Sequence, residues 1–409
     1  MEYRDIRSFL ALLAACSVSA AACAQGVLTE QESVRLALAR PDIAAVIDAT
    51  IEAARGDVSA AGRWPNPTLQ FQRESMHSSG QRNVERSYQL SQQFDLSGKR
   101  ALRRGAAEQR LAATVADTRQ RRRDIAAELR HRFYETMYRQ QLVEAIAQWE
   151  LRMSAIAATV DKLHASGEVA GYERRRIALE RATAQARLTV EQAAHGKARQ
   201  SLAALVGESA LTATPAGELL PADPPPLEAL LAQLAARPEL QALERRAGAF
   251  ELELKASRRA WIPDVTVGLG PKSQHNGVTR ETGTALSVSL PLPLFERDQA
   301  GQQRARAGAD AARGEAHLLR SRLEGDVRGL WQQLQRLNVA AREYRVHATT
   351  AGGDLVRIAE ASYRGGETGI LELLDAYRAA LDADSRAWEM SWNARQAAID
   401  LDNIAGNQP

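Results

Sequence analysis

The chain repeats one plan about 197 to 199 residues apart, and this repeat limits the fold more than any single motif does. Trp64 recurs as Trp261 at an offset of 197, and Gly167-Glu168 recurs as Gly366-Glu367 at an offset of 199. Because the offset hardly drifts, both halves have the same order of elements. Each half predicts a helix, two short strands, a very long helix, a tight turn and a return helix.

The composition favours long helices over an ordinary globular enzyme. Of 409 residues, 25% are charged and only 5% are aromatic, as in helices packed through narrow seams. The net charge of +3 is small for this length and by itself predicts no nucleic-acid partner. The sequence has no nucleophile elbow, phosphate-binding glycine loop or metalloprotease motif, and the seven histidines are scattered. We therefore expect no enzymatic activity, no cofactor and no metal site.

The N-terminus has the pattern of an export signal. Arg4 and Arg7 precede an apolar run, and Ala-Cys-Ala at 22–24 fits a cleavage site, which predicts a signal peptide at 1–24. The alternative is a lipoprotein signal that ends before Cys16. Both cysteines lie in this segment, so we expect no disulfide in the mature chain. No later stretch has the 18 consecutive apolar residues typical of a transmembrane helix.

Alternating and heptad patterns place the elements of each repeat. Apolar residues alternate with polar ones around Leu69 and Phe71 and again around Val267 and Leu269, which predicts strands with one apolar face. The first repeat, 25–220, is expected to hold a β-hairpin at 68–96, a long helix at 100–165 and a return helix at 172–205. A proline-rich linker at 221–226 leads to the second repeat, 227–405, with a hairpin at 264–292 and helices at 300–364 and 370–404.

Apolar residues in the long helices recur in steps of four and three, which predicts a heptad seam. At 1.5 Å per residue, about 65 residues form a rod of roughly 100 Å. The seam of the first rod is Leu142, Ile146, Trp149, Met153, Ile156, Val160 and Leu163; that of the second is Leu323, Val327, Leu330, Leu334, Leu337, Ala341, Tyr344, Ala348, Ala351, Leu355 and Ile358.

Four short strands in an exported chain pose a physical problem. Isolated hairpins are marginally stable, and a sheet inside a membrane must close because lipid cannot satisfy the hydrogen bonds of an open edge. Four strands cannot close a barrel, but three chains with four strands each give twelve. The pattern therefore suggests a trimeric outer-membrane barrel that continues into a tube of long helices.

Three segments carry a resemblance to a known family. Tyr363–Ala376 is similar to the TolC outer-membrane efflux family around its second periplasmic turn, and Gly167–Glu173 resembles the first turn. Gln92–Arg100, between strand and rod, is most similar to the cation-efflux branch typified by CzcC. The resemblance implies a mostly α fold with a small β part: a TolC-like trimer with a twelve-stranded outer-membrane β-barrel and a periplasmic α-helical coiled-coil barrel.

The resemblance also implies partners. We expect a homotrimer in outer-membrane lipid that extends into the periplasm and joins a periplasmic membrane-fusion adaptor and an inner-membrane pump of the resistance-nodulation-division type. The turns at Gly167-Glu168 and Gly366-Glu367 would dock the adaptor. A DNA-binding zipper is disfavoured by the export signal.

By the same resemblance, Glu372 and Asp375 would ring the periplasmic mouth, and Glu173 and Tyr363 would take part in closing it. Thr368 replaces an arginine usual in the family. Simpler interpretations remain: the acids as a solvated helix face, Tyr363 as a seam residue, and the two glycines as helix C-terminal residues.

Three functions follow from this sequence. The leading hypothesis is a passive exit duct for heavy-metal cations in a tripartite pump. The same duct serving drugs, organic compounds or type I protein secretion is an alternative. A non-transporting coiled-coil protein of the envelope is a distant third, because it would not need two hairpins.

Overall fold

The structure is a computed structural model, and it describes residues 26–78, 81–276 and 278–406. The predicted signal peptide at 1–24 and the alternative signal before Cys16 lie outside the described residues. The chain divides into two compact units, which are described separately. Unit 1 comprises the chain up to Leu36 together with Arg132–Leu219, and unit 2 comprises Ala37–His131 together with the chain from Leu220 onward.

Unit 1 is built around a pair of helices. Helix α3 (Lys99–Ala165) enters it from unit 2, and α4 (Gly171–Val206) follows after a short turn. The unit also holds most of α1 (Glu30–Leu38), the short α5 (Ser209–Thr212), and a parallel bridge of β1 (Val27–Leu28) with β4 (Thr214–Pro215). The bridge has no counterpart in the prediction. Buried seam residues in this part of α3 include Leu142, Ile146, Trp149, Met153 and Val160, as the heptad pattern predicts.

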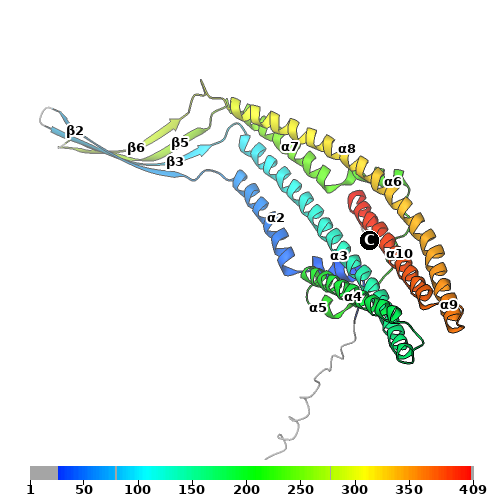
Figure 1. The fold of residues 1–409 in the computed structure, drawn as a ribbon. Coiled ribbons are helices and arrows are strands. Elements are labelled where there is room, and N and C mark those ends of the chain that lie inside the picture. Colours follow the sequence, from blue (N-terminus) through cyan, green and yellow to red (C-terminus); the bar gives the residue numbers. More distant parts are fainter. Residues whose placement is uncertain (1–25, 79–80, 277, 407–409) are drawn as a thin grey trace, which may run out of the picture. The chain divides into compact units, whose positions relative to one another are not determined.

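Unit 2 contains one four-stranded antiparallel sheet (Figure 1). Its strands are β2 (Thr68–Ser78), β3 (Gln81–Phe94), β5 (Val265–His275) and β6 (Arg280–Ser289), paired in that order. The two predicted hairpins therefore join edge to edge through β3 and β5, with Leu90 opposite Leu269.

The helices of unit 2 follow the predicted order. They are α2 (Pro41–Gly62), the first part of α3, α6 (Leu227–Gln233), the 3-10 turn η1 (Leu234–Ala236), α7 (Pro238–Arg258), α8 (Gln299–Tyr344), the π-helical turn η2 (Arg345–Thr349), α9 (Thr350–Arg364) and α10 (Ile370–Ala405). Figure 1 shows α7 lying along α8. A core joins α6, α8 and α10 through residues such as Leu230, Val327, Leu334, Ala397 and Leu401.

The predicted seam of the second rod is wrong beyond Tyr344. Leu323, Val327, Leu334 and Ala341 are buried as expected. After η2, however, the buried positions are Gly352, Val356 and Ala359, one residue later than predicted, whereas Leu355 and Ile358 are exposed in the single chain. A π-helical turn accommodates one extra residue, so it shifts every later side chain around the helix axis.

Candidate functional site

The two turns at the ends of the long helices have the same backbone hydrogen bonds. In the first, the Gly167 amide donates to the His164 carbonyl, and the Glu168 amide donates to Leu163. In the second, Gly366 donates to Tyr363 and Glu367 donates to Ser362, at 3.1 and 2.9 Å as in the first turn.

The central glycines of these turns have φ values of +83° at Gly167 and +73° at Gly366. A left-handed glycine that closes a helix with these two bonds is a Schellman-type cap. The helix C-terminal interpretation of both glycines is therefore confirmed, and docking at the same turns stays a prediction. The turn belongs to unit 1 in one case and to unit 2 in the other.

In the first turn, side chains join the two helices directly. The Arg174 guanidinium on α4 lies 2.7 Å from the Asp161 carboxylate on α3, and the Ser166 hydroxyl donates to Glu168 at 2.8 Å. Glu173, the predicted closing residue, is half-buried in the first turn of α4. Among the described residues its carboxylate has no hydrogen bond or ion pair, so it remains available to a partner.

In the second turn, Glu372 and Asp375 lie exposed in the first turns of α10. Asp375 forms an ion pair of 3.4 Å with Arg378, one turn further on. The Glu372 carboxylate lies close to Gly369, the residue before α10. An acid in the first turn also interacts favourably with the positive end of the helix dipole, so Glu372 has a structural role besides any role at a mouth.

Tyr363 is half-buried at the end of α9, and the described part of the chain gives its hydroxyl no hydrogen-bond partner. A second tyrosine, which sequence reasoning missed, links the two helices. The buried Tyr377 hydroxyl on α10 donates to Glu360 on α9 at 2.5 Å. The signal in the sequence was weak, because Glu360 and Tyr377 are separated by the turn and belong to no recognised motif. The Thr368 hydroxyl, at the position where the family usually has arginine, is buried without a hydrogen-bond partner.

The strand sheet sorts side chains by chemistry onto its two faces, because successive residues of a strand point to opposite sides. On one face, the apolar face, cross-strand rows join Leu69 to Leu90, Leu269 and Leu286, and Phe71 to Tyr88. The Phe71 and Tyr88 rings lie 4.8 Å apart between centroids. The opposite, polar face carries Gln70, Gln72, Gln89, Ser91, Thr266, Ser287 and Ser289.

Three carboxylates share one row of the polar face. Glu74 pairs with Glu85, Glu85 with Gln274, and Gln274 with Glu281. Lys272, on the same face, forms an ion pair of 2.5 Å with Glu85. This row follows from the strand register, and the sequence analysis did not identify it.

The segment between β3 and α3 folds around one carboxylate. Asp95 accepts bonds from the Ser97 amide and hydroxyl at 2.9 and 2.7 Å and from the Arg100 amide at 2.8 Å, which caps the start of α3. Burial alone would raise the pKa of Asp95, but these bonds, led by the one from the Arg100 amide, hold it below its ordinary value. The Asp-Leu-Ser-Gly-Lys-Arg motif therefore has a structural function.

The same junction is tied to the second half of the chain. The Lys99 ammonium lies 2.8 Å from Asp264, which precedes β5, and the Arg259 guanidinium donates to the Ser97 carbonyl at 3.0 Å. The Arg100 guanidinium stacks 3.4 Å from the centroid of the Trp64 ring. Gly98 and Asp298 precede the two long helices with φ values of +69° and +60°.

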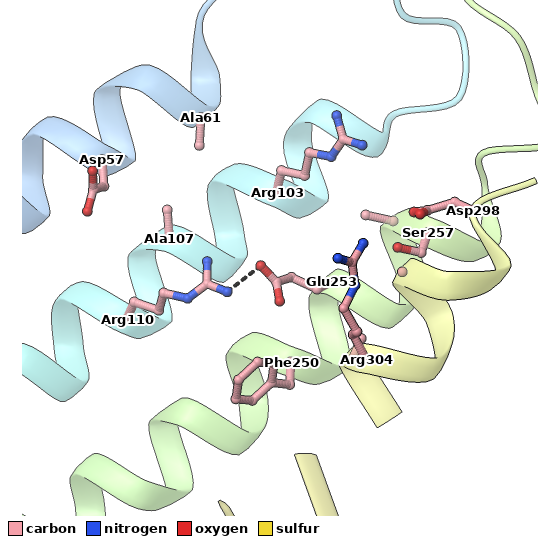
Figure 2. Close-up of a pocket in the computed structure, with 13 residues that line it drawn as sticks. Asp57, Ala61, Arg103, Ala107, Arg110, Phe250, Glu253, Ser257, Asp298 and Arg304 are labelled. Atoms are coloured by element: carbon pink, nitrogen blue, oxygen red, sulfur yellow. Dashed lines mark hydrogen bonds and ion pairs between the residues drawn. The ribbon is translucent and has the colours of Figure 1, made fainter. Parts of the chain in front are cut away.

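A cavity of about 660 Å³ lies between α2, α3, α7 and α8 (Figure 2). Arg103, Arg110 and Arg304 line it, and so do Asp57, Glu253 and Asp298. Arg110 and Glu253 form an ion pair across it (Figure 2). The three arginines and the three carboxylates of the lining balance in charge.

Within the described residues, no three histidine, cysteine, aspartate or glutamate side chains are placed to hold a metal ion. A separate observation is that none of the described helices combines the length and apolarity needed to cross a bilayer.

Comparison with known proteins identifies the family. The family model described as outer membrane efflux protein matches residues 230–407. The chain is 26% identical over 387 residues to the cobalt-zinc-cadmium resistance protein CzcC of Cupriavidus metallidurans. This alignment covers 94% of the present chain and 91% of CzcC. The nickel and cobalt resistance protein CnrC of the same organism is 30% identical over 68% of this chain and 66% of its own length. The chain belongs to the outer membrane efflux protein family.

A solved structure confirms the fold of this efflux protein. The outer membrane protein VceC of Vibrio cholerae superposes with a TM-score of 0.76 at 18% identity, over 92% of this chain and 96% of that one. The mostly α, TolC-like fold and the cation-efflux branch predicted from the sequence are thus confirmed. As a member of this family the protein resides in the outer membrane and extends into the periplasm.

Proposed function

We propose that this efflux protein is the exit duct of a tripartite pump that exports heavy-metal cations. The observation that carries the proposal is the match to CzcC over nearly the full length of both chains. The row of Glu74, Glu85 and Glu281 on the polar face supports it, because carboxylates lining a pore favour cations.

The duct is a homotrimer in this proposal. One chain supplies four strands with one apolar and one polar face, and an open edge is costly in lipid. Three copies supply twelve strands, which close a barrel with the apolar face toward lipid and the polar face toward the lumen. The duct is passive, and the pump and a periplasmic adaptor select and drive the cargo.

The turns at Gly167-Glu168 and Gly366-Glu367 dock the adaptor. Their support is the shared cap geometry, which presents two equivalent exposed turns per chain. Glu372 and Asp375 line the periplasmic mouth, supported by their exposure on one face of α10. Glu173 and Tyr363 hold the mouth closed, supported by side chains that lack partners in the described chain.

The experiment is a growth assay of a deletion strain on zinc, cobalt, cadmium, nickel, copper and silver, with hydrophobic drugs in parallel. We expect selective metal hypersensitivity that the intact gene reverses. Drug hypersensitivity with normal metal tolerance would contradict the assignment of metal cations as the cargo and would favour a duct for organic compounds. Normal growth on both panels, in a strain without a second such duct, would overturn export itself.

Variants in the same strain test the mouth. The double variant Glu372→Gln, Asp375→Asn removes two charges near the second turn. The control Glu324→Gln, Asp326→Asn removes two exposed charges from α8. The proposal expects altered metal tolerance with the first variant and wild-type tolerance with the control. Equal tolerance with both would contradict the proposed role of Glu372 and Asp375.

A further inference from the structure

Beyond the aromatic pair Phe71 and Tyr88, the apolar face of the sheet becomes cationic. Continuing along β2, β3 and β6 away from the helices, this face carries four exposed arginines, which we call the arginine belt: Arg73, Arg82, Arg86 and Arg280. They share a face with Leu69 and Leu90 because each lies an even number of residues from an apolar residue of its strand.

The glutamates and the arginines of the described strands lie on opposite faces of the sheet. In the described strands, every glutamate lies on the polar face, and the apolar face carries no carboxylate. The arginine belt and the acidic row therefore lie at similar positions along the strands but on opposite sides of the sheet. Because the arginines point away from the acids, no cross-strand ion pair on their own face neutralises them.

Arg73 and Arg86 are direct cross-strand partners. Like charges in that position repel and destabilise the pair of strands. Both side chains are exposed, and neither forms an ion pair with a described residue. Among the described residues, Arg82 donates to the Ser75 hydroxyl alone, at 3.2 Å. The belt is thus a concentrated positive charge without a counter-ion from the described chain, as expected of a surface that meets an external anion.

The position of the belt indicates which anion. Arg73 lies two residues after Phe71 on β2, and Arg86 lies two residues before Tyr88 on the antiparallel β3, so both lie about 7 Å further along the strands, away from the helices. Apolar residues face acyl chains and aromatic residues lie at the membrane interface, so the next side chains reach the headgroup layer. The strands enter α3 and α8 at their other end, so this headgroup layer belongs to the leaflet away from the helices.

We infer that the arginine belt binds the phosphate groups of outer-leaflet lipid, as found on lipid A. The planar guanidinium donates two parallel hydrogen bonds to a phosphate, which suits arginine to this task better than lysine. The Ser273 and Thr282 hydroxyls continue the row of Arg73 and Arg86 and add neutral donors. The inference rests on the proposed membrane insertion of the sheet and adds a lipid specificity to it.

The test measures binding of diphosphorylated lipid A to the purified full-length protein by native mass spectrometry in a mild detergent. The variant Arg73→Gln, Arg86→Gln should weaken binding by roughly tenfold to thirtyfold, since each arginine near a charged lipid surface contributes about a fivefold gain in affinity. The variant Arg73→Lys, Arg86→Lys should bind lipid A with an affinity between those of the wild type and the glutamine variant. Lipid A without its two phosphates should bind weakly to the wild-type protein. Its affinity should be no higher than the affinity of the glutamine variant for intact lipid A.

The control Arg322→Gln, Arg328→Gln makes the same charge change at exposed positions of α8 and should bind lipid A as wild type does. Equal binding by wild type and the belt variant, or equal binding of the dephosphorylated lipid, would overturn the inference. Displacement of lipid A by millimolar inorganic phosphate would indicate a small-anion site instead and would also overturn it.

Outer-membrane fractionation and trimer mobility, recorded for every variant, separate this inference from the proposed function. A wild-type protein that fails to reach the outer membrane or to form trimers contradicts the duct itself. A wild-type protein that inserts and trimerises but ignores the lipid phosphates contradicts only the role of the belt. The lysine variant keeps the positive charges. If it inserts and forms trimers as wild type does but binds lipid A more weakly, the loss is a loss of binding and not of folding.

Discussion

Lys99 and Asp264 form an ion pair with 2.8 Å between Nζ and Oδ1, and it joins the start of the first long helix to the start of the second hairpin. Both side chains are largely buried, with 16% and 17% exposed. Asp264 also accepts a hydrogen bond from the Gln93 side-chain amide, Nε2, at 2.8 Å. The two halves of the chain are thus joined at the junction of sheet and helices by charge as well as by the pairing of β3 with β5.

We predict that Lys99→Met and Asp264→Asn each destabilise the protein, because either change leaves a largely buried polar group without its partner. The double variant should be at least as stable as the less stable of the two single variants, which corresponds to a coupling free energy of about 1–2 kcal/mol between Lys99 and Asp264. Chemical denaturation in detergent measures all four proteins. Additive losses would show that the two charges do not interact across the junction.

The Asp95 cap predicts a specific loss of stability in acid. Because hydrogen bonds lower the pKa of Asp95 in the folded protein, its contribution is present above the unfolded pKa of about 3.9 and is lost as pH falls through the folded pKa. The Asp95→Asn variant should therefore be less stable than wild type at pH 7. Its melting temperature should fall by less than that of wild type between pH 5 and pH 3. Asp326→Asn, an exposed carboxyl on α8, is the control and should retain the wild-type slope.

The second turn requires glycine at one position and tolerates a side chain at its neighbour. Gly366 has φ +73°, so Gly366→Ala should cost about 1 kcal/mol of local stability, whereas Gly365, with φ −76°, should accept alanine. Hydrogen exchange of the Glu367 amide, which is bonded to Ser362, reports the effect directly. Exchange that is equally slow in both variants would contradict the cap.

Adjacent glycines in α9 provide a matched pair. A Cβ on Gly352 would lie 3.2 Å from the Ala380 Cα on α10, whereas one on Gly353 meets nothing within 4 Å. Gly353→Ala should stabilise α9 by about 0.5–1 kcal/mol. Gly352→Ala should stabilise α9 by a smaller amount or should destabilise the packing of α9 against α10. Hydrogen exchange across α9 measures both. A larger gain at Gly352 would mean that α9 and α10 pack through a different face.

Much of the fold could be predicted because the repeat and the residue periods are strong signals. The alternation around Leu69 and Val267 and the glycines at 167 and 366 place the strands and turns within a few residues. The break in the second rod could not be predicted in the same way. Ala348 and Ala351 fit a heptad seam in either register, so nothing in the sequence marks the extra residue that η2 accommodates.

The candidate site was harder to read than the fold. The Lys99–Asp264 and Glu360–Tyr377 contacts join residues that no short motif connects, and they appear only when the elements pack. The arginine belt and the acidic row were present in the alternation itself. They were missed because the period-two pattern was used to find apolar residues and was not extended to charge. The roles of Glu173, Tyr363, Glu372 and Asp375 depend on neighbouring chains and remain predictions.

The most direct test of a cation duct is the reversal potential of the purified protein in a planar bilayer under a potassium chloride gradient. The account predicts discrete conductance with a cation-selective potential. It also predicts that Glu74→Gln, Glu281→Gln, which removes two acids per chain from the polar face, lowers the selectivity while the conductance remains. An anion-selective potential, or no conductance from folded trimers under any condition that opens the mouth, would contradict the central claim.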